Sequence, residues 1–462
     1  MDNQEKIRLF EETPVPRAVM TMVIPTIMSS LVMVIYNLAD TYFVGMLNDP
    51  VQNAAVTLAS PVLLAFNAVN NLFGVGTSSM MSRALGQKDY ATVRRSSALG
   101  FYCALFSGIL FSVLFTAFRR PLLVVLGADP VTAGATGEYL KWTVTFGAAP
   151  AILNVVQAYL VRSEGSALHA SIGTMSGCLL NIVLDPIFIL PWGLGLGAAG
   201  AGLATFLSNC FACLYFFVLL FVKRKNTYIS IRPSMLRQAK WFVFAGICGV
   251  GIPSAIQNLL NVTSMTVLNN FTSVFGSDAV AAMGIAQKIN MVPMYIAMGL
   301  SQGIMPLVSY SYGSGNGNRL KSVVAFSGRI ALAFLLAATA CYYFGADFLI
   351  SMFMKNESII GYGGRFLHGM CLALPFMGVD FLAVGIFQAC GLGGKALAFA
   401  VLRKIVLEIP ALYIWNLVLP LYGLAYAQAT AEAVLCVAAI VVLYRLFRQM
   451  EQRGSPAPQN PL

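Results

Sequence analysis

Four long stretches of this chain contain no charged residue: 50–82, 96–118, 186–222 and 241–277. Each exceeds the roughly 20 apolar residues that cross a bilayer as an α-helix. Only 10% of all residues are charged, whereas a soluble domain carries roughly 25%. A transmembrane barrel is disfavoured, because its strands alternate polar and apolar residues instead of running continuously apolar. The sequence therefore predicts an all-α polytopic membrane protein.

Twelve transmembrane helices are expected, arranged as two pseudo-symmetric six-helix lobes. The expected spans are 18–45, 51–80, 95–117, 135–161, 168–190, 198–222, 241–270, 278–307, 322–344, 358–388, 396–418 and 422–446. Several exceed 20 residues, which allows a tilt or a kink. The predicted division has a first lobe at 1–222, a basic cytoplasmic linker at 223–240, a second lobe at 241–446 and a cytoplasmic tail at 447–462.

The 29 Lys and Arg residues are concentrated at alternate ends of the predicted spans. Most fall on the two tails and the even-numbered loops, which the positive-inside rule places in the cytoplasm. We therefore expect a multi-pass protein of the cell (inner or cytoplasmic) membrane with both termini cytoplasmic. The polar start MDNQEKIRLFEETPVPR is not typical of a cleavable signal peptide. The net charge of +11 follows from the basic loops and does not indicate nucleic-acid binding.

The two halves of the chain resemble each other. The segment IPTIMSSLV begins at Ile24 and IPSAIQNLL begins at Ile252, while MSRALGQK with Gly86 matches VSYSYGSG with Gly313. These and further matches keep the same order and a nearly constant separation. Six spans per half make the repeats parallel, related by an axis along the membrane normal. Transporters commonly bind their substrate between such halves.

Two carboxylates lie within apolar segments of the first half: Asp40 in IYNLADTYFVG and Asp185 in NIVLDPIFIL. A charged side chain in hydrocarbon is costly, so an intramembrane acid is a functional candidate by default. Asn181 shares the helix face of Asp185, Thr205 is expected at a similar depth, and Asn154 somewhat deeper. Such oxygen ligands suit Na⁺, and the carboxylates equally suit a proton. The alternative is a buried hydrogen-bonded network that fixes helix packing.

The second half carries Asp380 and Glu408. Asp380 has no basic neighbour in its span and is a candidate for contacting a cationic substrate. Glu408 follows Lys404 by four residues, so a local salt bridge is an equally good interpretation. Lys288 is expected to be the only clearly buried Lys or Arg, either paired with an acid or extended to the membrane interface. The role of Glu432 in the last span stays open.

Polar side chains within the predicted spans are candidates for contacting a transported molecule. They are Tyr36, Asn37, Gln157, Gln257, Asn261, Gln287, Lys288, Asp380 and Glu408. No phosphate-binding G-x-x-x-x-G-K-[ST] loop occurs, because GLGGKA has Ala396 after its lysine and the wrong glycine spacing. His169 and His368 are too isolated to form a metal site. The chain is therefore expected not to be an enzyme and to need no cofactor beyond a coupling ion.

Five ordered segments carry a family resemblance. They are IPTI…YNLADTYFVG, ASP at 59–61, SRALGQK at 82–88, VRSEG at 161–165 and NIVLDPIFI at 181–189. With them the chain resembles the multidrug and toxic compound extrusion (MATE) family, above all its bacterial MepA-like branch. The resemblance implies two six-helix lobes, a V-shaped central cleft and alternating access. It also implies an antiporter that exports cationic, often aromatic drugs in exchange for Na⁺ or H⁺.

The resemblance further implies where the coupling ion binds. The family's first-lobe cation site, with Na⁺ as a candidate metal, falls on Asp40, Asn181, Asp185 and Thr205, with Asn154 nearby. Some relatives carry an acid in the seventh span, where this chain has Gln257, Asn258 and Asn261. This departure leaves Asp380 as the better candidate in the second lobe. The expected partners are small cationic drugs and the lipid bilayer; nucleic acid is not expected, and the protein is expected to be a monomer.

Two other functions fit parts of the pattern. A lipid-linked oligosaccharide flippase would need a basic cavity to bind phosphates, whereas the first half supplies acids. An intramembrane enzyme would need acidic or histidine clusters at a membrane face, and the loops here are short and poor in both. Drug export is therefore preferred, and a flippase-type carrier is the alternative.

Overall fold

The computed structural model describes residues 2–353 and 356–453, with side chains up to residue 450. All regular structure within these residues is helical. The predicted tail at 447–462 is only partly covered: residues up to 453 continue the last helix, and 454–462 lie outside the described residues.

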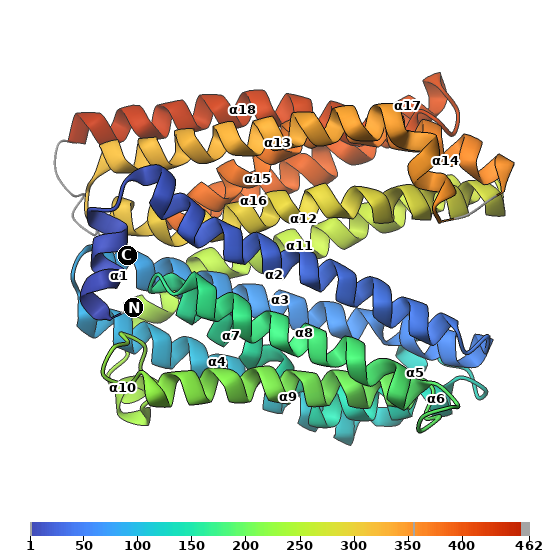
Figure 1. The fold of residues 1–462 in the computed structure, drawn as a ribbon, viewed down its shortest axis with the longest axis horizontal. Coiled ribbons are helices and arrows are strands. Elements are labelled where there is room, and N and C mark those ends of the chain that lie inside the picture. Colours follow the sequence, from blue (N-terminus) through green and yellow to red (C-terminus); the bar gives the residue numbers. More distant parts are fainter. Residues whose placement is uncertain (1, 354–355, 454–462) are drawn as a thin grey trace.

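Six spans form the first lobe (Figure 1). Five are continuous helices: α2 (Val15–Gly45), α3 (Pro50–Gly86), α4 (Tyr90–Ala117), α8 (Ala167–Ile189) and α9 (Ala198–Val222). The fourth span consists of α6 (Ala133–Leu140), the π-helical turn η1 (Lys141–Phe146) and α7 (Ala148–Ser163), and it bends by 51° before α7. Gly147 and Pro150 stand at this bend, where a proline removes the amide donor that would continue the helix.

The second lobe repeats this arrangement (Figure 1). Its continuous helices are α11 (Trp241–Ser273), α12 (Ser277–Gly313), α13 (Gly317–Ser351) and α18 (Leu424–Arg453). The tenth span bends by 47° between α14 (Glu357–Cys371) and α15 (Leu374–Ala389). The eleventh consists of α16 (Gly393–Val401), the π-helical turn η2 (Leu402–Glu408) and α17 (Ile409–Val418). It carries charged residues in its middle, among them Arg403 and Lys404.

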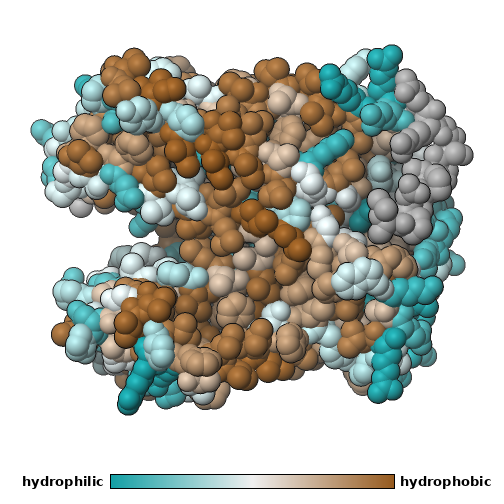
Figure 2. All heavy atoms as spheres, turned by 180° about the vertical axis from the view of Figure 1, so that it is seen from behind, coloured by the Kyte–Doolittle hydropathy of each residue, from teal (hydrophilic) through white to brown (hydrophobic). Residues whose placement is uncertain are grey.

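Long apolar helices account for the membrane spans among the described residues. Nine helices are long and apolar enough to cross a membrane, and the two bent pairs raise this number to eleven. The segment of α16, η2 and α17 is the twelfth, which confirms the predicted fold of two six-helix lobes. Apolar side chains cover the middle of the molecule, and polar ones gather toward its two ends (Figure 2).

Short helices mark the two ends of the molecule. At one end lie α1 (Asn3–Glu11), α10 (Pro233–Arg237) and the last turns of α18, while α5 (Arg119–Val125) lies at the other (Figure 1). Between the lobes, the end that holds α5 is hollowed by a notch (Figure 2). We call the notched end the open end and the opposite one the closed end.

The internal repeat is visible in two turns at the closed end. Lys88 after α3 and Gly315 after α12 both adopt left-handed backbone conformations, with φ of 59° and 73°. Asp89 and Asn316 then cap the next helices, since each side chain accepts a hydrogen bond from the backbone amide three residues further on, at 3.0 and 2.9 Å. Equivalent residues of the two halves therefore build equivalent turns.

Glycines bring the backbones of the two lobes together at the closed end. A Cβ atom on Gly86 would overlap the carbonyl oxygen of Tyr310, and one on Gly313 would overlap that of Arg83. These two glycines are the ones that the internal repeat pairs. Two further glycines meet carbonyl oxygens of the opposite lobe in the same way, Gly76 and Gly251. Small residues permit such close approach of membrane helices, and here they bring the backbones of the two lobes into direct contact.

Candidate functional site

A cavity of about 700 Å³ lies between the two lobes. Its wall comes from α2, α3, α6, η1, α7, α8 and α9 of the first lobe and from α11, α12 and α15 of the second. Toward the open end it is lined by Asp40 and Tyr139, and toward the closed end by Arg162 and Gln388. At the closed end Ser79 donates a hydrogen bond to the carbonyl of Gln388 at 2.6 Å, so that contact between the lobes closes the floor.

The wall is polar but almost uncharged. Among its described residues, Asp40 is the one carboxylate and Arg162 the one basic residue. Amide side chains supply much of the remaining polarity: Asn37, Asn67, Asn70, Asn71, Asn154, Asn181, Asn209, Gln257, Asn258, Asn261, Gln302 and Gln388. Amides donate and accept hydrogen bonds without a fixed charge, so the cavity can contact varied polar molecules.

Asn181 joins two of the predicted cation-site residues. In the amide orientation that satisfies its neighbours, its nitrogen donates to Asp185 Oδ2 at 2.8 Å and its oxygen accepts from the backbone amide of Thr205 at 3.1 Å. Asp185 is fully buried and Asn181 is 2% exposed. The contact between Asn181 and Asp185 follows from their spacing of four residues on α8. The packing of α9 against α8 brings Thr205 beside these two residues.

Asp40 lies beside this group on the cavity wall and is partly exposed. It is close enough to Asp185 for the two charges to interact, and both acids also interact with Tyr36 and Tyr139. No Lys, Arg or His among the described residues forms an ion pair with either acid. One acid is therefore reachable from the cavity, the other is buried, and neither forms an ion pair with a basic residue of the described part of the chain.

The other first-lobe candidates divide between the cavity and the core. Tyr36, Asn37 and Asn154 line the cavity. Asn154 also donates to the carbonyl of Pro150 at 2.8 Å and to Asn209 Oδ1 at 3.0 Å. Gln157 does not belong to the wall: it is fully buried, and Cys213 Sγ lies 3.4 Å from its carbonyl oxygen.

In the second lobe, Gln257 and Asn261 line the cavity, whereas four other candidates do not: Gln287, Lys288, Asp380 and Glu408. The expectation that Lys288 is the only clearly buried basic residue is wrong. Lys288 is exposed, while Lys6, Arg162, Arg403 and Lys404 are buried, two of them through the packing of the eleventh span against its neighbours.

Buried charges in the second lobe neutralise one another instead of facing the cavity. The predicted salt bridge of Glu408 is confirmed, with Lys404 Nζ 2.6 Å from Glu408 Oε2. Arg403 Nε donates to Glu432 Oε1 at 2.7 Å, and Asp380 lies close enough to interact with both. The sequence correctly shows that Asp380 has no basic neighbour along its own helix. In the fold, however, Arg403 of η2 lies beside it. Asp380, Arg403 and Glu432 are all at most 4% exposed.

Replacing Arg403 with leucine is therefore expected to destabilise the second lobe strongly. The change leaves Asp380 and Glu432 buried without a cation, and breaking a buried ion pair by removing one partner costs about 3–5 kcal/mol. The thermal unfolding temperature of the purified protein in detergent measures this effect. The double variant R403L/E432Q should recover part of the loss, because it removes one of the uncompensated acids. A single variant as stable as the parent would contradict the electrostatic role of Arg403.

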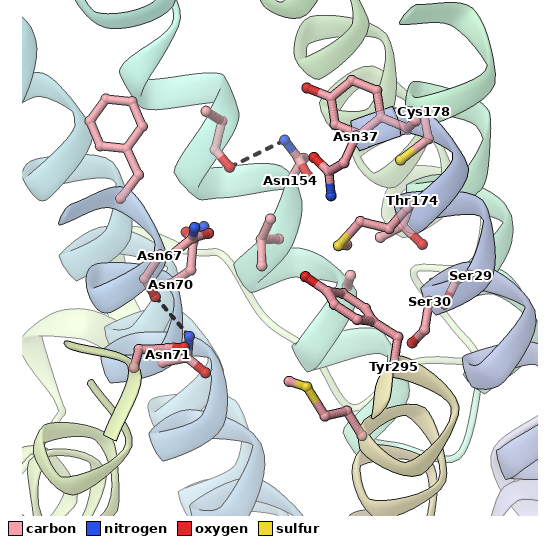
Figure 3. A pocket seen from close by; sticks show the side chains of 18 of the residues that line it. Ser29, Ser30, Asn37, Asn67, Asn70, Asn71, Asn154, Thr174, Cys178 and Tyr295 are labelled. Carbon is pink, nitrogen blue, oxygen red and sulfur yellow. Dashed lines mark hydrogen bonds between the residues drawn. The ribbon is translucent and has the colours of Figure 1, made fainter. Parts of the chain in front are cut away.

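Asn67, Asn70 and Asn71 of α3 were missed by the sequence analysis. They lie on one side of the cavity, across from Asn37 of α2 (Figure 3). Their spacing of three and four residues places them on one helix face, within the uncharged stretch 50–82. That spacing is the sequence pattern from which a shared polar face of these three residues could have been predicted.

Two six-helix lobes that meet at one end and enclose a polar cavity within the membrane have the architecture of an alternating-access carrier. The fold and the cavity therefore define a polytopic membrane transporter. Its relatives agree with this class.

The MatE family model matches residues 25–187 and 253–414, once in each half of the chain. The chain is 32% identical to "Multidrug export protein MepA" of Staphylococcus aureus (strain MRSA252) over 96% of each protein, and 32% identical to the protein of that name from Staphylococcus saprophyticus, with the same coverage. The solved outward-facing conformation of a multidrug resistance MATE family transporter of the MOP superfamily superposes with a TM-score of 0.91 at 26% identity, covering 97% of this chain and 99% of that one. A MOP superfamily transporter from Pyrococcus furiosus Vc1 gives 0.88 at 26% identity and the same coverage.

The chain belongs to the MATE family of membrane transporters. The two matches of one family model confirm the internal repeat that the sequence indicates. They also confirm the predicted family and fold class.

Proposed function

We propose that this transporter exports cationic organic compounds in exchange for Na⁺ or H⁺. The observation that carries the proposal is the pair Asp40 and Asp185, which interact with each other and have no ion pair to a basic residue among the described residues. Such a pair can take up one cation or proton, or attract a cationic drug, and give it up again. The name of the MepA relatives, multidrug export protein, supports the same activity.

We further propose that the protein lies in the cytoplasmic membrane with the closed end, including α1 and α10, in the cytoplasm. The concentration of Lys and Arg in the tails and even-numbered loops supports this orientation. The cavity then opens outward. This conformation agrees with the high similarity to an outward-facing relative.

The proposed cycle uses charge neutralisation in the first lobe. A cation or proton from outside binds at Asp40 and Asp185, and the loss of net charge favours release of the drug and repacking of α2, which contains Pro25 within its length. The transporter then turns inward, releases the ion and takes up drug from the cytosol or inner leaflet. A bound ion shifts this equilibrium only by its difference in affinity for the two states.

The composition of the cavity favours drug export over a flippase of lipid-linked oligosaccharides. Recognition of a diphosphate group would need several basic donors, and Arg162 is the one basic residue among the described residues of the wall.

Dye transport in proteoliposomes, with Na⁺ and pH gradients imposed separately, tests the proposal. We expect movement of an ethidium-like dye to be driven by one of the two gradients and to stop when that gradient is collapsed. The gradient that drives it identifies the coupling ion. Dye movement that is indifferent to both gradients would contradict ion-coupled export.

A further inference from the structure

Arg162 is a buried cation on the cavity wall that lacks an anionic partner. It lies near the closed end of α7 and is 5% exposed. Its Nε atom is buried with no hydrogen-bond partner. None of the carboxylates in the described part of the chain lies within ion-pairing distance of it. The contact that the structure gives the guanidinium is with the ring of Tyr159, whose centroid is 5.7 Å from Cζ.

The other basic side chains that are buried in the described part of the chain are paired. Lys6 lies 2.6 Å from Glu164, Lys404 lies 2.6 Å from Glu408, and Arg403 donates to Glu432. An unpaired buried charge carries a large desolvation penalty. This desolvation penalty is present at Arg162 in the folded protein. A molecule in the cavity can reach this side chain.

The surrounding packing holds Arg162 in place. Tyr159 is 8% exposed and lies directly against the backbone of α3, because a Cβ atom on Gly74 would overlap its ring. The ring of Tyr159 therefore holds the guanidinium of Arg162 in position before any molecule binds. A planar guanidinium presents paired N–H donors that match the two oxygens of a carboxylate.

The two charges of the wall lie toward opposite ends of the cavity. Asp40 is near the open end, while Arg162 lies eight residues beyond Asn154 on α7, about 12 Å further along the helix axis at 1.5 Å per residue. Uncharged amides, including Asn154, fill the wall between them. A molecule with a cationic and an anionic group at its two ends would match this pattern of charge.

We propose that Arg162 binds a carboxylate of the transported molecule, so that the cavity accepts zwitterions whose cationic group points toward Asp40. This inference rests on the proposed export of cationic organic compounds and adds to it a second recognition element. On binding, the carboxylate displaces water from the guanidinium and accepts charge-assisted hydrogen bonds from its N–H groups. Arg162 is thus assigned as a residue that determines specificity.

A matched pair of fluorescent dyes tests the assignment. Rhodamine 110 has a free carboxylate and is zwitterionic, while rhodamine 123 is its methyl ester and is a cation. Equilibrium binding of each dye to the purified full chain, measured by fluorescence polarisation, gives the ratio of the two affinities for each variant. We expect R162Q to lower the affinity for rhodamine 110 relative to rhodamine 123 by at least about tenfold, which corresponds to about 1.4 kcal/mol. R162K, which keeps the charge, should retain a larger share of the preference.

Lys288→Gln is the matched control, because it removes one positive charge at an exposed site outside the cavity wall. Thermal unfolding of each variant separates misfolding from loss of binding, and R162K supplies a second test if R162Q is unstable. The proposal is overturned if the affinity ratio of R162Q equals that of the parent or of K288Q, or if the parent protein does not bind rhodamine 110. Because binding needs no ion gradient, the proposed export can fail in proteoliposomes while this assignment stands, and the reverse also holds.

Discussion

Replacing Asp40 or Asp185 with asparagine is expected to abolish export of an ethidium-like dye while leaving the protein folded and inserted. Asparagine keeps the shape of the side chain but cannot alternate between a charged and a neutral form. A coupling free energy of about 1–3 kcal/mol corresponds to about a 5- to 150-fold change in binding affinity, so export should fall by at least about fivefold. Dye efflux from cells, normalised to the amount of protein in the membrane, measures the effect.

The two acids differ in their surroundings, and the variants should differ accordingly. Asp40 faces the cavity, whereas Asp185 is fully buried and accepts from the amide of Asn181. Asp40→Asn should therefore also weaken binding of a cationic dye, while Asp185→Asn should act mainly on coupling. Asp278→Asn is the control, because Asp278 is an exposed acid in the first turn of α12 outside the cavity wall. Export at the parent rate by either Asp40→Asn or Asp185→Asn would falsify the assignment of the coupling site.

Valine in place of Gly86 or Gly313 is expected to open the closed end of the molecule. Each added side chain would overlap a backbone carbonyl of the opposite lobe, which a change of rotamer cannot relieve. Overpacking of this kind costs about 1–3 kcal/mol, and every 1.4 kcal/mol changes the balance of two conformations about tenfold. The conformation that is closed at this end should lose population by about 5- to 150-fold, and dye export should fall with it.

Cys390 reports this change without further engineering. It is 3% exposed at the end of α15, next to Gly391, whose own Cβ position is occupied by the guanidinium of Arg83 from the first lobe. A thiol reagent should label Cys390 about tenfold faster in the valine variants, as read by mass spectrometry of its peptide. Gly284→Val on α12 is the matched control, because a Cβ atom there meets open space. Equal labelling rates in G313V and G284V would show that the glycine contacts do not hold the lobes together.

Much of the candidate coupling site follows from local sequence. Asn181 and Asp185 meet because they are four residues apart on one helix, and the apolar segments around Asp40 and Asp185 single out these acids. The second-lobe candidates behave differently. Glu408 pairs with Lys404 four residues before it in the same span, as the sequence predicts, whereas Arg403 reaches Asp380 from the eleventh span. The sequence shows that an acid is buried, and it does not show which basic residue from another helix lies beside it.

The length and order of the apolar stretches determined the spans, the two lobes and the repeat, because hydrocarbon requires each spanning segment to satisfy its backbone hydrogen bonds internally as a helix. Tertiary structure alone decided which helix faces line the cavity. Helices in a membrane are apolar on nearly all sides, so their pattern does not distinguish a face toward lipid from one toward a neighbouring helix. The polar wall of amides, the unpaired Arg162 and the exposed Lys288 emerge only when the rotation of each helix is fixed by packing, as at the glycines of the closed end.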